Sequence, residues 1–90
     1  MNAQAPTVGV DAALTLLETN PALAAKQARE ILAAVPAHPG AVLLLGMAAN
    51  AERDFAHAAA VLDPLTRAQP KSARAWLELG VARIGMGERE

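Results

Sequence analysis

The chain of 90 residues has no cysteine and no tyrosine, and it has only one phenylalanine and one tryptophan. Without cysteine it can form neither a disulfide framework nor a thiolate metal site, which fits a reducing compartment and predicts a cytoplasmic location. The apolar residues are mostly alanine, leucine and valine, and the first two are strong helix formers, whereas the aromatic residues typical of strands are scarce. The composition therefore predicts an all-α protein of closely packed helices.

The sequence also lacks runs of like charge and long apolar runs. Its formal net charge is −1, which argues against the basic surface that nucleic-acid binding requires. No stretch approaches the ~20 apolar residues of a membrane span. Residues 1–10 contain neither Lys nor Arg, so a secretory signal is not expected.

No cluster of residues indicates catalysis or ligand chemistry. The two histidines, His38 and His57, stand apart, and the carboxylates are scattered along the chain. The only serine, Ser72, is interpreted as a helix cap. We therefore expect no enzyme activity, catalytic residue, metal or cofactor.

A repeated dipeptide is the most informative feature that is present. Leu45-Gly46 and Leu79-Gly80 lie 34 residues apart. Val42 stands three residues before Leu45, and Trp76 stands three residues before Leu79. This pattern resembles the tetratricopeptide repeat, whose 34-residue unit places Trp three residues before Leu-Gly and ends with Pro. Pro36 and Pro70 share the spacing.

The resemblance implies an α-α superhelix of stacked antiparallel helix hairpins with about five helices in a single domain. The expected layout is a flexible N-terminus (1–7), a degenerate first repeat (8–38, with Val8, Asp11 and Ala12 in the Trp, Leu and Gly places), a second repeat (39–72) and the first helix of a truncated third repeat (73–90). Positions expected to pack between the repeats are Ala24, Ala28, Leu45, Gly46, Ala58, Leu62, Trp76, Leu79 and Gly80.

Apolar spacing and cap residues predict the individual helices. They should cover residues 8 or 10 to 18, 21–35 after the cap Asn20, 40–50, 55–68 after Asp54 and 73–85 after Ser72. The third should be the most buried, and Pro64 should kink or split the fourth. The buried side of the second should contain Leu23, Ala24, Ala28, Ile31 and Leu32, and that of the fifth Trp76, Leu79, Gly80 and Ile84.

The family resemblance also implies a binding scaffold with a groove along the first helix of each hairpin. The groove residues would be Leu43, Met47, Asn50, Arg74, Leu77, Val81 and Ile84. A family subset grips a C-terminal carboxylate, but of the places that would do so here (Gly9, Ala13, Leu44, Arg74 and Glu78) only Arg74 fits. We expect an apolar peptide or helix as the partner. The alternatives are that Leu43, Met47, Leu77 and Val81 are ordinary packing and that Asn50 only ends its helix.

Two further expectations concern the C-terminal end. The last hairpin is expected to lack its second helix, so the apolar side of its first helix should stay uncovered. We therefore expect the chain to self-associate, for example as a homodimer. The phrases Ala28-Arg29-Glu30-Ile31-Leu32, His38-Pro39 and Val61-Leu62-Asp63-Pro64-Leu65 resemble the N-terminal repeats of bacterial proteins with a sulfotransferase domain. That resemblance implies that the chain is an accessory segment of a larger enzyme, as an alternative to the interaction scaffold. A third hypothesis is a structural spacer without a partner of its own.

Overall fold

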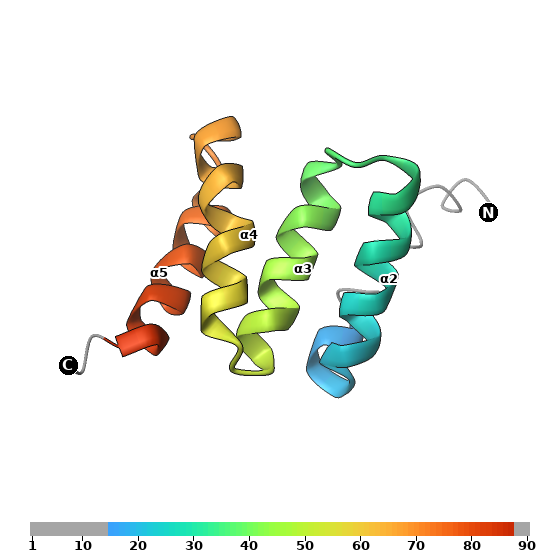
Figure 1. Ribbon diagram of the computed structural model, residues 1–90, viewed down its shortest axis with the longest axis horizontal. Coiled ribbons are helices and arrows are strands. Elements are labelled where there is room, and N and C mark those ends of the chain that lie inside the picture. The colour runs from blue at the N-terminus through green and yellow to red at the C-terminus, as the bar shows by residue number, and fades with distance from the viewer. Residues whose placement is uncertain (1–14, 88–90) are drawn as a thin grey trace.

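The computed structural model describes residues 15–87, and all regular structure in that range is helical. Residues 15–19 are followed by α2 (Pro21–Ala34), α3 (Pro39–Ala51), α4 (Phe55–Ala68) and α5 (Ala73–Gly87). The four long helices stand in chain order, each beside the next (Figure 1). The predicted stack of antiparallel helical hairpins is confirmed. The flexible terminus (1–7) and the front of the first repeat lie outside the described residues.

Each long helix begins at a side chain that accepts a backbone N–H of the first turn. Asn20 accepts from Leu23, Asp54 from His57 and Ser72 from Ala75, as the sequence predicts. The fourth cap was not expected, because His38 accepts the Ala41 N–H through Nδ1 at 3.1 Å. Because its ring accepts this N–H at the start of α3, His38 serves as a structural cap.

The boundaries of the long helices agree with prediction within two residues, but a split at Pro64, one of the two effects expected of this proline, is wrong. Helix α4 runs unbroken from Phe55 to Ala68 with Pro64 inside it. Proline removes only one hydrogen bond of the helix ladder. Its neighbours Leu62 and Leu65 are buried against α3 and α5, so tertiary packing holds the helix together across the defect.

The core consists of two clusters of mostly small residues, and α3 contributes to both. Between α2 and α3 lie Ala24, Ala25, Ala28, Leu44 and Ala48. Between α3, α4 and α5 lie Ala49, Ala58, Leu62, Leu65, Ala75, Leu79 and Ala82. Helix α3 also has the most buried residues of the four, as predicted. Alanine at these positions lets the helix axes approach closely.

The two glycines of the repeated dipeptide have different surroundings. A Cβ on Gly46 would lie 2.5 Å from Cγ of Leu62, whose side chain is fully buried, so α3 and α4 cross at Gly46 as predicted. A Cβ on Gly80 would meet nothing within 4 Å, so the prediction of a crossing there is wrong. No helix after α5 lies within residues 15–87 to cover Gly80.

The predicted burial of three other residues is also wrong, and for two of them the cause is again the uncovered side of α5. Trp76 is 49% exposed and Ile84 69% exposed, because both lie on the side of α5 turned away from α4. Leu23 is exposed, since the buried side of α2 is centred on Ala24, Ala25 and Ala28 and leaves Ile31 and Leu32 only half-buried. The remaining repeat positions are placed as expected: Ala24, Ala28, Gly46, Ala58, Leu62 and Leu79 are buried, and Leu45 is half-buried.

The contrast between the glycines predicts opposite effects of one substitution. Gly46→Ala should lower the free energy of unfolding by about 1–3 kcal/mol, because the added methyl group displaces the enclosed Leu62 side chain. Gly80→Ala should raise it by about 0.5–1 kcal/mol, since alanine favours the helix and meets open space. Urea denaturation followed by circular dichroism measures both, and equal effects at the two sites would contradict the assignment of the crossing.

Candidate functional site

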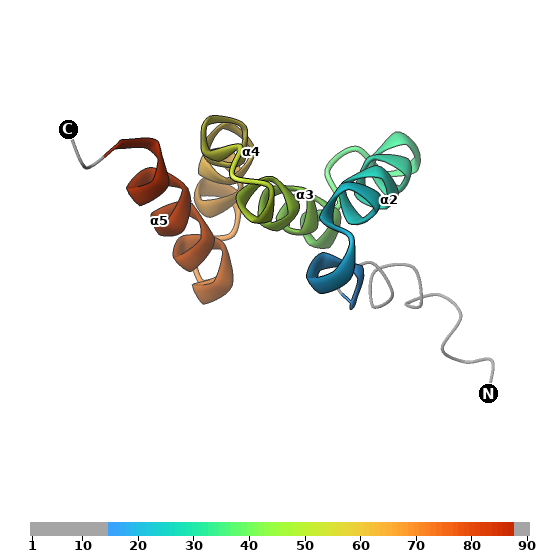
Figure 2. The same cartoon turned by 90° about the horizontal axis from the view of Figure 1, so that it is seen from below.

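A groove of about 610 Å³ lies on one side of the helix stack. We call it the inner groove, and its lining comes from residues 15–19, α3 and α5: Leu17, Glu18, Met47, Asn50, Ala51, Arg74, Glu78 and Val81. Seen from below, the blue segment and part of α5 project beyond α3 on the same side (Figure 2). The groove is thus built by the first helix of each successive hairpin, with α2 and α4 standing behind.

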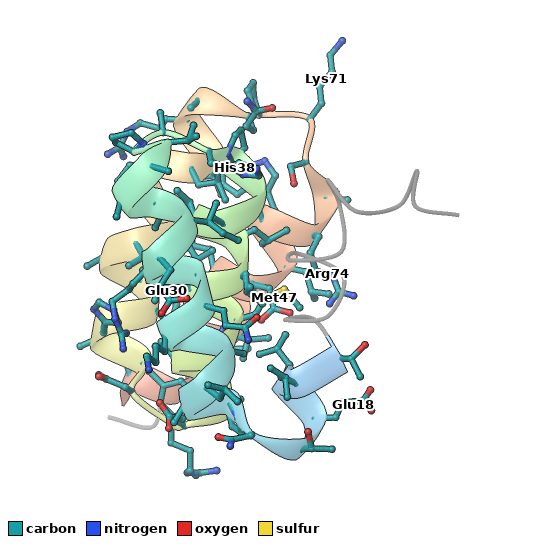
Figure 3. All side chains as sticks on the ribbon, turned by 90° about the vertical axis from the view of Figure 1, so that its right-hand side faces the viewer. Glu18, Glu30, His38, Met47, Lys71 and Arg74 are labelled. Carbon is teal, nitrogen blue, oxygen red and sulfur yellow. The ribbon has the colours of Figure 1, made fainter. Side chains whose placement is uncertain are left out.

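The side chains that line the inner groove are partly apolar and partly charged. Leu17, Met47 and Val81 supply the apolar part, and Glu18 and Arg74 the charged part. Met47 and Arg74 lie on one side of the stack, with Glu18 below them on the blue segment (Figure 3). Such a mixture of apolar surface and a few polar groups is typical of a site for another molecule.

A hydrogen-bond chain joins α3 to α5 across the groove. The Asn50 side chain donates through Nδ2 to both the backbone oxygen and Oε1 of Glu78, at 3.0 and 2.9 Å. Arg74 donates to the other carboxylate oxygen of Glu78 at 3.2 Å. Arg74 and Glu78 lie one helical turn apart on α5, and the chain of bonds fixes the position of α5 relative to α3.

The orientation of Asn50 leaves one polar atom without a partner. Both groups that face Nδ2 are acceptors, so the amide cannot be turned around without losing both bonds. Its Oδ1 atom is buried and accepts no hydrogen bond from the described residues. A buried carbonyl without a donor costs about 1–3 kcal/mol, so this unpaired acceptor offsets part of what the two bonds of Nδ2 contribute to the link between α3 and α5.

The alternative interpretation of Asn50 as the residue that only ends α3 is wrong. The helix continues through Ala51, with Glu52 as its C-cap. Arg53 follows with φ 65°, in the left-handed region where glycine or asparagine is usual, and its N–H donates to the Asn50 backbone oxygen at 2.9 Å. Arg53 therefore makes the turn, and Asn50 is free to face α5.

The structure brings together only some of the residues predicted for the groove. Met47, Asn50, Arg74 and Val81 line the inner groove. Leu43 instead packs against the core cluster of α3, α4 and α5. Leu77 and Ile84 are exposed and are not among its lining residues. Three lining residues were not predicted from the sequence: Leu17, Glu18 and Ala51. Glu78 was predicted there only as a place for carboxylate binding.

A second surface is the apolar side of α5 that no described helix covers. We call it the outer face of α5 and define it by Trp76, Leu77, Gly80 and Ile84. The three side chains are 49%, 58% and 69% exposed. The indole N–H of Trp76 donates to the Pro70 backbone oxygen at 2.9 Å, so the ring is held in place although it is half-exposed. Contiguous exposed apolar residues of this kind mark interaction sites.

Two smaller grooves on the other side of the stack repeat each other along the chain. The first is lined by Ala25, Arg29, Leu45, Ala49 and Glu52, together with Asp54 and His57 at the start of α4. The second contains the residues 34 positions later, which are Ala59, Asp63, Leu79, Arg83 and Met86. Its volume is about 520 Å³ against about 250 Å³ for the first. The repeat thus holds in space, and the second groove is wider where no α4 equivalent is described.

The described part of the chain has no sign of a metal centre or of a membrane-spanning helix. No three histidine, aspartate or glutamate side chains gather there as a metal centre would require. Among the same residues, no helix has both the length and the apolar character needed to cross a membrane.

Helical hairpins stacked in register, with a groove on the side of their first helices, form a fold like that of the tetratricopeptide repeat. Residues 39–82 match the family model of the tetratricopeptide repeat, a segment that contains α3, α4 and most of α5. This match supports the resemblance drawn from the sequence. Repeats of this family are generally non-catalytic modules that mediate protein interactions.

Similarity to known proteins is limited to this family model. No curated protein and no solved structure matches the chain. The resemblance to the repeat region of sulfotransferase proteins is therefore unsupported.

The link between α3 and α5 can be tested by removing its two donors separately. Asn50→Ala should lower the free energy of unfolding by about 1–3 kcal/mol, because it breaks two buried bonds to Glu78. Arg74→Ala should change it by less than about 1 kcal/mol, since that pair is largely exposed. Urea denaturation would contradict the proposed role of Asn50 if both variants were equally stable.

Proposed function

We propose that this chain is a non-catalytic protein-interaction scaffold that holds a peptide or helical segment of another protein in the inner groove. The observation that carries the proposal is the groove itself, in which apolar Met47 and Val81 lie beside the charged side chains of Arg74 and Glu18. Leu17 extends the apolar floor to the first described segment.

The groove lining suggests the chemistry of the partner. Apolar side chains would cover Leu17, Met47 and Val81, as the sequence predicts. The segment should also bring N–H donors, because Glu18 offers an exposed carboxylate, whereas Arg74 is already paired with Glu78. We therefore expect an apolar segment with backbone or basic side-chain donors, and not an acidic one.

Self-association through the outer face of α5 is the second part of the proposal. Its support is the exposure of Trp76, Leu77 and Ile84 on a helix whose opposite side is core. An apolar patch that lacks a covering helix lowers its free energy by pairing with another apolar surface.

The remaining predictions from the sequence concern the setting of the chain. A cytoplasmic location follows only from the absence of cysteine, and a bacterial source only from the sulfotransferase resemblance. The alternative of an accessory segment of a larger enzyme would make the same helices a positioning or dimerising unit. The interaction scaffold is preferred, because residues 39–82 match the tetratricopeptide repeat, whose domains generally mediate protein interactions.

A random-peptide phage library selected on the immobilised chain tests the groove. We expect enrichment of apolar peptides, and we expect Met47→Glu and Val81→Glu to weaken the selected peptides by at least about tenfold, because each places a charge against apolar contacts. Ala33→Glu adds the same charge to an exposed position of α2 outside the groove and should bind normally. Peptides that bind all four proteins equally would exclude the groove as the site.

A further inference from the structure

We propose that the inner groove selects a partner segment that carries a lysine or arginine among its apolar residues, with the cation of that side chain at Glu18. This inference rests on the peptide binding proposed above and makes Glu18 the residue that determines which segments bind. The charge of the partner thus has a fixed place, at the end of the groove where Glu18 lies.

Glu18 is the charged lining residue whose charge nothing in the described chain balances. Three charged side chains line the inner groove, namely Glu18, Arg74 and Glu78. Arg74 and Glu78 form an ion pair at 3.2 Å, so their charges largely cancel. Glu18 is exposed and forms no ion pair within residues 15–87. The lining therefore keeps one uncompensated negative charge.

The backbone at the same end of the groove adds to the negative potential. Ala51 is the last residue of α3 and lines the groove together with Glu18. The blue segment with residues 15–19 and the end of α3 lie at the same end of the stack (Figure 1). The C-terminal end of a helix carries partial negative charge, and the last turn of α3 has no basic residue to balance it. A cation beside Glu18 is thus favoured by two sources.

The nearest cation along the chain does not neutralise this end. Arg53 follows α3 closely, but its guanidinium lies over the Phe55 ring, 5.7 Å from the ring centre, at the start of α4. Arg53 is not a lining residue of the inner groove, and Arg74 is the only lysine or arginine that is. The cation that Glu18 lacks must therefore come from a bound molecule.

The charges give the groove two different ends. Arg74 and Met47 lie on one side of the stack, with Glu18 below them (Figure 3). At the upper end the charge of Arg74 is already neutralised by Glu78, and the lower end is negative. A segment whose apolar side chains cover Met47 and Val81 gains most when its basic residue lies at the lower end.

The apolar contacts supply most of the affinity, and Glu18 supplies the discrimination between segments. An exposed ion pair contributes about two- to fivefold to a binding constant and is weakened by salt. An acidic residue at the same place would be repelled, so the ratio between basic and acidic segments exceeds the gain from the ion pair alone. The methylene groups of a lysine or arginine can also lie on Leu17 while the cation stays hydrated beside Glu18.

Parallel selection of a random-peptide phage library tests the assignment. The immobilised proteins are the 90-residue chain, Glu18→Gln, Glu18→Lys and the control Glu30→Gln, which removes the same charge from an exposed position of α2 outside the groove. We expect the natural chain and Glu30→Gln to enrich peptides that contain Lys or Arg. Glu18→Gln should lose this enrichment, and Glu18→Lys should enrich peptides with Asp or Glu instead.

Calorimetric titration with the most enriched synthetic peptide measures the size of the effect. Glu18→Gln should weaken its binding by about two- to fivefold, and Glu30→Gln should not. Raising the NaCl concentration from about 50 to 500 mM should weaken binding to the natural chain but not to Glu18→Gln. Glu18 is exposed, so its replacement should keep the helical circular dichroism signal.

The outcomes separate this inference from the proposed function. Selected peptides without a basic residue, or a basic preference that survives Glu18→Gln, would overturn the role of Glu18. If Met47→Glu still weakened those peptides, the groove would remain the binding site. Selection of acidic peptides by the natural chain would overturn the proposed charge of the partner. Peptides that bind Met47→Glu and the natural chain equally would exclude the groove, and both proposals would fail.

Discussion

The close crossing of α3 and α4 at Gly46 is the contact on which the rest of the fold depends. Helix α3 has buried residues towards both neighbours, so it needs a partner on each side, and the fully buried Leu62 side chain fills the space that Gly46 leaves. This crossing sets the position of α4, and α4 in turn carries most of the packing of α5. A helix stack of this kind gains its stability from nearest-neighbour contacts, so a change at one crossing is transmitted along the chain.

The width of the inner groove follows from a different and weaker set of contacts. Helices α3 and α5 touch little directly, and the bonds from Asn50 to Glu78 are the side-chain hydrogen bonds that join them. Asn50 lines the groove, and its Nδ2 group donates both of its hydrogen bonds to Glu78, whereas its Oδ1 atom is buried without a donor. One residue thus contributes to both the spacing of the repeats and the polarity of the groove.

The sequence allowed much of the fold to be predicted, because caps and apolar spacing act locally. Asn20, Asp54 and Ser72 begin the helices that they were expected to begin. Burial was less predictable, since it depends on which neighbours exist. The same Leu-Gly dipeptide is enclosed at Gly46 and open at Gly80, and no local pattern distinguishes the two. For the site, spacing identified Met47, Asn50, Arg74 and Val81, but Leu17 and Glu18 enter through a segment with a degenerate repeat pattern.

The two surfaces of α5 point in directions that let them act together. At 100° per residue, the mean direction of Arg74, Glu78 and Val81 of the inner groove lies about 110° around the helix from that of Trp76, Leu77, Gly80 and Ile84. A second copy on the outer face would therefore leave the groove of each chain accessible. Two grooves held at a fixed separation would bind a partner with two suitable segments more tightly than either groove alone, because the second contact becomes intramolecular. Pairing through α5 would then supply avidity and not merely cover apolar surface.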